Sequence, residues 1–235
     1  MKALLLAAGK ATRLGALSQT TPKCLQQVGD EILLDRVVRQ LREVGVTEFL
    51  INTHHLAEQI ADHIAGRPDQ EDFKVIYEPS LLGTLGTVKA NADFFGDDPG
   101  WVVHADNFIE GELSPVLNAF AVRLEDVWGS MLTFEVDDPA LYGVVNLDSS
   151  GVVTSFFEKQ ADASGRIASA ATFMFDKRVF QLMEALPPSC RDISHDLLPQ
   201  LVGRLVAAPA MGRVIDIGTP EGLATARRLA RELGS

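Results

Sequence analysis

With 235 residues and a formal net charge of −11, the chain can bury a substantial core, and its acidic balance argues against a nucleic-acid-binding surface, which needs a basic footprint. The charge leaves open a phosphorylated substrate that is held by a few cations in a cleft. No apolar run is long enough to span a membrane, and Cys24 and Cys190 lack a metal-ligand spacing, so we expect free thiols and a cytoplasmic protein that binds neither membranes nor nucleic acid.

The first half of the chain alternates short apolar runs with amphipathic segments. Strands separated by single helices imply right-handed crossovers and a mostly parallel sheet. Such sheets place ligands at the carboxyl ends of their strands, where Gly9–Arg13, Gly83–Gly86 and Asp106 fall. The expected strands are 2–7, 47–53, 73–77 and 101–105, and the expected helices are 32–44, 56–65 and 84–95.

The second half is richer in strand-like segments, which predicts antiparallel strands that either extend the same sheet or form a small lid. The final helix has Thr219 as its N-cap and Pro220 at its first position. Because no linker, repeat or low-complexity segment is visible, we predict a single domain over residues 1–235. The expected strands are 127–136, 142–147, 152–157 and 170–175, and the expected helices are 176–186, 194–202 and 220–233.

The loop after the first strand has the composition of a phosphate-binding loop. Ala7-Ala8-Gly9-Lys10-Ala11-Thr12-Arg13 is followed about ten residues later by Pro22-Lys23. Small residues let backbone N–H groups approach an anion closely, and Arg13 and Lys23 would neutralise its charge. Taken alone, the loop is equally consistent with a first βα turn that carries incidental basic residues.

Two aspartates end expected strands near this loop. Asp106 follows the strand at 101–105, and Asp216 follows Val214-Ile215 just before the last helix. Carboxylates together with substrate phosphates suit Mg²⁺, although either residue alone could be a loop carboxylate or a helix cap. As a pair beside Arg13 and Lys23, they favour phosphoryl or nucleotidyl chemistry.

Two further motifs carry weaker signals. The turn Leu82-Gly83-Thr84-Leu85-Gly86-Thr87 could hold a flat base against the backbone, or simply be a tight βα turn. Glu158-Lys159 offers an acceptor and a cation for a sugar hydroxyl and a phosphate, although most such neighbours are solvated surface residues.

Together these motifs resemble the sugar-1-phosphate nucleotidylyltransferases, especially the compact mannose- or heptose-1-phosphate guanylyltransferases. The family's Ala-Ala-Gly-x-Gly-Thr-Arg-Leu loop and its Pro-Lys-x-Leu segment correspond to residues 7–14 and 22–25. Its metal aspartates, the second in Asp-Ile-Gly-Thr-Pro, correspond to Asp106 and Asp216. Its Tyr-Gly-Val-Val and Glu-Lys motifs correspond to residues 142–145 and 158–159, so the match spans nearly the whole chain.

The resemblance implies a Rossmann-like α/β fold of the nucleotide-diphospho-sugar transferase type, with a mixed, mostly parallel sheet flanked by helices. It implies a nucleotide-binding half at 1–110 and a sugar-binding half at 111–235. The implied activity is Mg²⁺-dependent transfer of a nucleotidyl group from a nucleoside triphosphate, with GTP favoured, to a sugar 1-phosphate. The implied roles are catalysis for Arg13 and Lys23, metal binding for Asp106 and Asp216, nucleotide binding for Ala8, Gly9, Lys10, Ala11, Thr12, Gly83 and Thr84, and sugar-phosphate binding for Glu158, Lys159 and Ser169.

Departures from the family pattern keep other functions open. Ala11 replaces a loop glycine, and Ser169-Ala170-Ala171 replaces an Asn-Ala-Gly that contacts the sugar. The alternatives are a cytidylyl- or uridylyltransferase with another acceptor, such as phosphocholine or an amino-sugar phosphate, and a non-catalytic homologue that binds a nucleotide-sugar. The sequence leaves the oligomeric state open, with a homodimer among the candidates.

Overall fold

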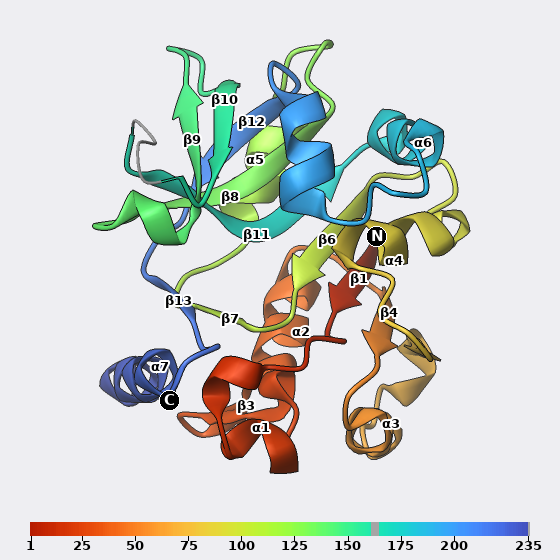
Figure 1. The fold of residues 1–235 in the computed structure, drawn as a ribbon, viewed down its shortest axis with the longest axis vertical. Helices are drawn as coiled ribbons and strands as arrows, with labels where there is room; N and C mark the ends of the chain where they lie inside the picture. Colours follow the sequence, from red (N-terminus) through yellow and green to blue (C-terminus); the bar gives the residue numbers. More distant parts are fainter. Residues whose placement is uncertain (161–164, 235) are drawn as a thin grey trace. The chain divides into compact units, whose positions relative to one another are not determined.

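The computed structural model describes residues 1–160 and 165–234, which fall into two compact units (Figure 1). The first unit comprises residues 1–81, 103–112 and the described residues from 212 onward. The second comprises residues 82–102 and the described residues of 113–211. The units therefore alternate along the chain, and the prediction of a single domain with halves divided at residue 110 stays a prediction.

The first unit is built on a parallel sheet. Its strands follow the order β1 (Lys2–Leu6), β4 (Glu48–Thr53) and β5 (Phe73–Tyr77), and only the last two residues of β6 (Gly100–His104), a neighbour of β1, belong to this unit. The register pairs Leu4 with Leu50 and Ile51 with Val75. β1 and β4 are buried along most of their length, as expected for strands inside a parallel sheet, whereas β5 lies at the edge of the sheet and is more exposed. The predicted alternation of parallel strands with the helices α2 (Leu33–Glu43) and α3 (Ala57–Ala65) is confirmed.

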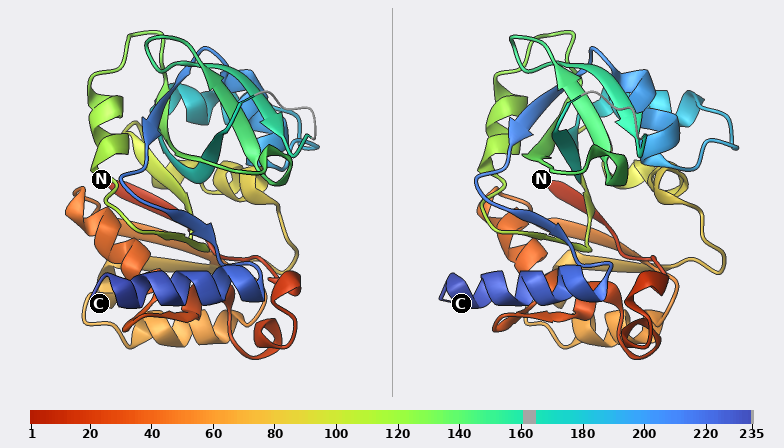
Figure 2. Two further views of the ribbon diagram at one scale, coloured as in Figure 1. Left: turned by 90° about the vertical axis from the view of Figure 1, so that its left-hand side faces the viewer. Right: turned by 60° about the vertical axis from the view of Figure 1, so that its left-hand side comes forward.

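Smaller elements complete the first unit around the carboxyl ends of these strands. β7 (Asn107–Ile109) pairs antiparallel with β13 (Val214–Asp216), and β2 (Gln27–Val28) pairs with β3 (Glu31–Ile32). The predicted cap of α7 (Pro220–Glu232) is confirmed, because Thr219 Oγ1 accepts a hydrogen bond from the Gly222 N–H at 3.1 Å. α7 packs against β13 and β2 (Figure 2). The remaining short helices are η1 (Thr12–Leu14), α1 (Leu17–Thr20), η2 (Lys23–Leu25) and η3 (Gln70–Asp72).

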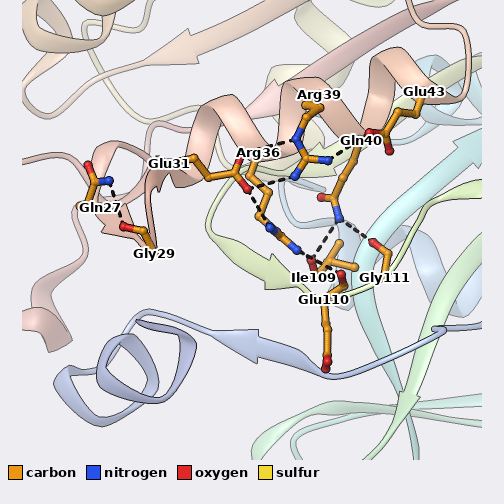
Figure 3. A network of polar contacts seen from close by, with 10 residues as sticks. All are labelled: Gln27, Gly29, Glu31, Arg36, Arg39, Gln40, Glu43, Ile109, Glu110 and Gly111. Carbon is orange, nitrogen blue, oxygen red and sulfur yellow. Dashed lines mark hydrogen bonds and ion pairs between the residues drawn. The ribbon is translucent and has the colours of Figure 1, made fainter. Parts of the chain in front are cut away.

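A buried polar network ties α2 to the segment that follows β7 (Figure 3). Arg36 donates from Nε to Ile109 O at 3.1 Å and from Nη2 to Glu110 O at 3.0 Å. Gln40 Nε2 donates to Ile109 O at 3.0 Å and to Gly111 O at 2.6 Å. Both side chains belong to residues that are at most 6% exposed. Hydrogen bonds that satisfy buried groups in this way fix the backbone close to Asp106.

The second unit contains a mostly antiparallel sheet of order β10-β9-β11-β8-β12. Only the β8–β12 pair is parallel among its described strands. A bulge interrupts β11 between Ser169 and Phe173. The strands are β8 (Gly129–Glu135), β9 (Gly143–Leu147), β10 (Val153–Glu158), β11 (Ile167–Phe175) and β12 (Leu205–Pro209), and the helices are α4 (Thr84–Ala90), η4 (Ala92–Phe94), α5 (Ser114–Ala121), η5 (Pro139–Leu141) and α6 (Lys177–Ala185).

Two predicted helices differ from the structure. The α-helix predicted at 194–202 is wrong: a π-helical turn, η6 (Ile193–Leu197), leads into the 3₁₀ turn η7 (Leu198–Leu201). Pro199 explains this, because it has no N–H to donate and its ring clashes with the preceding turn. The helix predicted at 84–95 ends at Ala90, and a 3₁₀ turn follows it. Among the described residues, no helix has both the length and the apolar character needed to cross a membrane.

Candidate active site

The loop after β1 encloses a small cavity in the first unit. The Ala7 N–H donates to Asn52 Oδ1 at 2.8 Å, which anchors the start of the loop to β4. Ala11 then adopts a left-handed backbone with φ of 50°. The cavity has a volume of about 180 Å³ and is lined by Leu6, Ala7, Gly9, Ala11, Thr12, Arg13, Lys23, Cys24, Asp106 and Gly218. Most of the predicted loop residues thus share one cavity with three of the four predicted charged residues.

The four predicted catalytic and metal-binding residues form one ion cluster. Lys23 Nζ donates to Asp106 Oδ2 at 2.7 Å and to Asp216 Oδ1 at 2.6 Å. Arg13 Nη2 donates to Asp216 Oδ2 at 3.1 Å. Lys23 is 9% exposed, whereas each aspartate side chain is about one-third exposed. Asp106 and Asp216 therefore share the same cation and remain open to solvent on another side.

Strand pairing brings the two aspartates together. Asp216 is the last residue of β13 and lies opposite Asn107, the first residue of β7, and Asp106 immediately precedes that strand. The hydrogen bonds from Arg36 and Gln40 hold the other end of β7 to α2. The separation of the carboxylates thus follows from backbone register, which is a stiff constraint.

The charges of the cluster favour ionised aspartate. Burial raises the pKa of Asp216, but the Lys23 ammonium, the Gly218 N–H and the Arg13 guanidinium outweigh it, and the net pKa lies below the ordinary value. Cys24 behaves in the opposite way, because burial and the nearby Asp106 charge raise its thiol pKa to about 12. Cys24 therefore lines the cavity as a neutral thiol, unsuited to act as a nucleophile at neutral pH.

Gly218 is a residue of this cluster that sequence reasoning missed. A Cβ atom there would lie 2.8 Å from Asp216 Oδ1, 2.9 Å from Lys23 Nζ and 3.0 Å from Arg13 Nη2. Its N–H donates to Asp216 Oδ1 at 2.8 Å. The residue was visible in the Asp-Ile-Gly-Thr-Pro motif, but only the structure shows that its missing side chain provides the space for three charged groups.

Gly83 and Thr84 lie in the second unit, and contacts within the protein explain why a glycine and a threonine stand at these positions. Gly83 has a φ of 83°, and a Cβ there would lie 2.4 Å from Arg191 O. Thr84 Oγ1 accepts a hydrogen bond from the Ile193 N–H at 2.8 Å. The turn therefore needs its glycine for packing against residues 191–193, and its role in nucleotide binding stays a prediction.

The predicted sugar-phosphate residues also lie in the second unit. Lys159 Nζ lies 3.4 Å from Glu158 Oε1, and the Glu158 side chain is only 12% exposed. Ser169 begins the β11 bulge, where its Oγ accepts a hydrogen bond from the Ala171 N–H at 3.2 Å. Ala171 has a φ of 51°. The sugar-phosphate roles of these residues stay predictions.

Ala11 and Ala171 share one unusual property. Both stand where the resembled family has glycine, and both adopt a left-handed backbone, with φ of 50° and 51°. A left-handed conformation costs an alanine roughly 1 kcal/mol or more. The glycine-like backbone shape is therefore kept at both positions without the glycine.

The donor set of the cluster fits a magnesium ion. Asp106 and Asp216 each place a carboxylate oxygen against one common cation, and Mg²⁺ is bound in proteins by one or two carboxylates together with phosphates and water. No group of three or more histidine, cysteine or acidic side chains in the described part of the chain forms a metal cluster. The remaining ligands of such an ion would have to come from substrate phosphates and water.

Comparisons with known proteins agree with the geometry. The family model described as Nucleotidyl transferase matches residues 2–232. A nucleotidyltransferase of low-salt glycan biosynthesis from Haloferax volcanii is 28% identical, covering 99% of this chain and 66% of the relative. A mannose-1-phosphate guanyltransferase from Emericella nidulans is 27% identical, covering 96% of this chain and 63% of the relative. The chain thus spans slightly less than two thirds of the length of these curated relatives.

A solved structure has a similar fold. A Bacillus anthracis protein assigned as a glucose-1-phosphate thymidylyltransferase, crystallised in complex with a sucrose, superposes with a TM-score of 0.85. The sequence identity is 25%, and the alignment covers 99% of this chain and 96% of the other. The predicted α/β fold class, a mixed and mostly parallel sheet flanked by helices, is confirmed.

Proposed function

The chain belongs to the nucleotidyl transferase family, as its motifs predict, and on this premise we propose that it transfers a nucleotidyl group from a nucleoside triphosphate to a sugar 1-phosphate. An oxygen of the sugar phosphate attacks the α-phosphorus, the bond from that phosphorus to the bridging oxygen breaks, and pyrophosphate leaves with this oxygen. The observation that carries the proposal is the ion cluster of Arg13, Lys23, Asp106 and Asp216 beside the cavity of the small-residue loop.

The charged residues would act by positioning and neutralisation, because the reaction needs no covalent enzyme intermediate. Arg13 has a side chain that is 67% exposed and can turn from Asp216 to the departing pyrophosphate. Lys23 lines the cavity and would steady the α-phosphate and the incoming phosphate. The loop backbone from Ala8 to Thr12 would lie along the phosphates, where small side chains allow a close approach.

Mg²⁺ is the metal that we propose for Asp106 and Asp216. Both carboxylates would hold the ion, which would offset the charge that develops on the leaving group. The contacts of the two carboxylates support the assignment, because both face one common cation and each side chain remains about one-third exposed.

GTP is the nucleotide that we propose, and the residues 82–87 support it through their resemblance to guanylyltransferases. A relative named as a mannose-1-phosphate guanyltransferase is among the matches, and so is one named as a glucose-1-phosphate thymidylyltransferase. Glu158, Lys159 and Ser169 are the residues that we propose for the sugar phosphate.

The two free cysteines are typical of a reducing compartment and support a cytoplasmic location.

Pyrophosphate release tests the proposal directly. The purified chain is incubated with Mg²⁺, each of GTP, UTP, dTTP and CTP, and a set of acceptors that includes mannose 1-phosphate, glucose 1-phosphate, an amino-sugar phosphate and phosphocholine. We expect release with GTP and a sugar 1-phosphate. Turnover with CTP and phosphocholine would assign the alternative acceptor class. Nucleotide-sugar binding without any turnover would identify a non-catalytic homologue.

Asp106→Ala provides the test of the metal site. We expect it to remove Mg²⁺-dependent turnover and to leave the fold intact, because Lys23 keeps its contact with Asp216. The matched control is Asp62→Ala on the exposed side of α3. Circular dichroism and thermal unfolding check the fold of both variants. Near-normal turnover by Asp106→Ala would contradict the metal assignment.

A further inference from the structure

Lys23 is the cation that Asp106 and Asp216 share in this structure. Its Nζ lies 2.7 Å from an oxygen of the first and 2.6 Å from an oxygen of the second. The backbone of Gly218 closes one side, since a Cβ there would lie 2.9 Å from Nζ. A divalent ion on the same two oxygens would compete for their lone pairs and lie close to a like charge. The ammonium and the metal ion therefore exclude each other.

The cluster has no net charge with which to attract a second cation. Two carboxylates face two cations, Lys23 and Arg13, and Arg13 Nη2 lies 3.1 Å from Asp216 Oδ2. Cys24, which lines the same cavity, adds no negative charge, because its thiol stays protonated. The substrate-free site is thus internally neutralised, and a free metal ion gains little by entering it.

A phosphate chain supplies what the cluster lacks. Lys23 also lines the cavity of about 180 Å³ enclosed by the loop. A lysine side chain is flexible and carries its charge on a compact ammonium, so Lys23 can reach a phosphate in the cavity by rotation about its own bonds. The phosphate oxygens then replace the two carboxylates as its acceptors, and the carboxylates lose their counter-ion.

Building on the proposed function, we propose that Lys23 fills the position of the metal ion in the substrate-free protein. It leaves that position when a triphosphate binds, so that Asp106 and Asp216 accept a divalent cation only together with the phosphate chain. Lys23 is thereby a positioning residue for the metal as well as a ligand of the phosphates. The two sites are coupled, because one ammonium cannot serve both at once.

Manganese binding in the absence of nucleotide tests this inference. Electron paramagnetic resonance measures free Mn²⁺ during titration of the wild type, Lys23→Met, Lys23→Arg and the exposed control Lys74→Met. We expect Lys23→Met to bind Mn²⁺ more tightly than the wild type by a factor on the order of ten or more. Lys23→Arg and Lys74→Met should match the wild type, and adding Asp216→Asn to Lys23→Met should abolish the gain. Equal Mn²⁺ affinity of wild type and a folded Lys23→Met would overturn the inference.

A second measurement needs only the wild type and stays informative if Lys23→Met does not fold. Crystals are soaked with MnCl₂ alone or with MnCl₂ and inorganic tripolyphosphate, and anomalous scattering locates the metal. We expect a peak between Asp106 and Asp216 only in the second soak, with Lys23 turned to the phosphates. A peak with MnCl₂ alone, or none in either soak, refutes the inference. Neither readout requires turnover, so a failure of the proposed activity would show separately as absent pyrophosphate release.

Discussion

Replacing Gly218 by alanine would place a methyl group inside the ion cluster. The new Cβ would lie 2.8 Å from Asp216 Oδ1, 2.9 Å from Lys23 Nζ and 3.0 Å from Arg13 Nη2. Comfortable van der Waals contacts begin at about 3.5 Å, so these atoms would have to retreat by roughly half an ångström. Arg13 and Lys23 each donate a hydrogen bond to Asp216, so the three side chains cannot retreat independently.

The size of the effect follows from the bonds that must stretch. A hydrogen bond to a charged group contributes about 1.5–3 kcal/mol, and we take the lower end because the Asp216 and Arg13 side chains are 34% and 67% exposed. Alanine recovers about 0.4–1 kcal/mol by restricting the unfolded chain. We therefore expect the free energy of unfolding to fall by about 1 kcal/mol. We expect kcat/KM to fall by about 10- to 100-fold, since both proposed catalytic cations are displaced.

Urea unfolding and steady-state pyrophosphate release measure the two effects. Gly66→Ala is the matched control, because Gly66 has a φ of −80° and a Cβ there would meet Asp62 O at an ordinary 3.5 Å. We expect this control to stay within about 0.5 kcal/mol of the wild type in stability and to keep its turnover. Wild-type kcat/KM and stability in Gly218→Ala would show that the cluster does not need the space, which refutes the reasoning.

Three further predictions concern the turns and the charges. Gly83→Ala should lower the free energy of unfolding by about 2–4 kcal/mol, because its Cβ would meet Arg191 O at 2.4 Å, whereas Gly86→Ala, with a nearest contact of 3.3 Å, should cost much less in the same urea titration; equal losses would contradict this. Ala11→Gly should raise stability by up to about 1 kcal/mol, because the relief of left-handed strain exceeds the entropy lost to a more flexible unfolded chain, and a loss of more than about 1 kcal/mol would be inconsistent with that strain. The pKa of Asp216 is lowered in the folded state, so its contribution to stability is fully present above its ordinary pKa of about 3.9 and is lost as the pH falls through the lower folded value. Between about pH 2 and 5, the free energy of unfolding should therefore fall less steeply with decreasing pH in Asp216→Asn than in the wild type. An unchanged slope would argue against this contribution of Asp216.

The fold was predictable where burial imposes a simple pattern. The strand expected at 47–53 is β4 (Glu48–Thr53), an inner strand with a buried apolar run, and the one at 73–77 is β5, an edge strand in which apolar residues still predominate. The two-residue strands β2 and β3 are too short to leave a periodic signal. α5 and β12 were missed because packing within the second unit decides them more than local sequence does.

The candidate site was predictable in its residue types and not in its contacts. Arg13, Lys23, Asp106 and Asp216 stand out by their motifs, but the hydrogen bonds of Lys23 reach 83 and 193 residues along the chain. Such contacts depend on strand register, which a single sequence does not specify. At Gly83 the structure shows a close packing contact with Arg191, which fits the alternative of a tight turn, and the nucleotide-binding role stays a prediction.

The β7–β13 pair also separates two kinds of evolutionary change. The chain leaves the first unit after Glu112 and returns at Gly212, and the Glu110 N–H donates to Arg213 O at 2.9 Å, close to both crossing points. Insertions, deletions or replacements between those points therefore leave the spacing of Asp106 and Asp216 untouched. The pairing of β7 with β13 that fixes this spacing lies within the first unit. On the proposed function, we expect acceptor preference to vary through changes within residues 113–211, while the cluster of Arg13, Lys23, Asp106 and Asp216 stays the same.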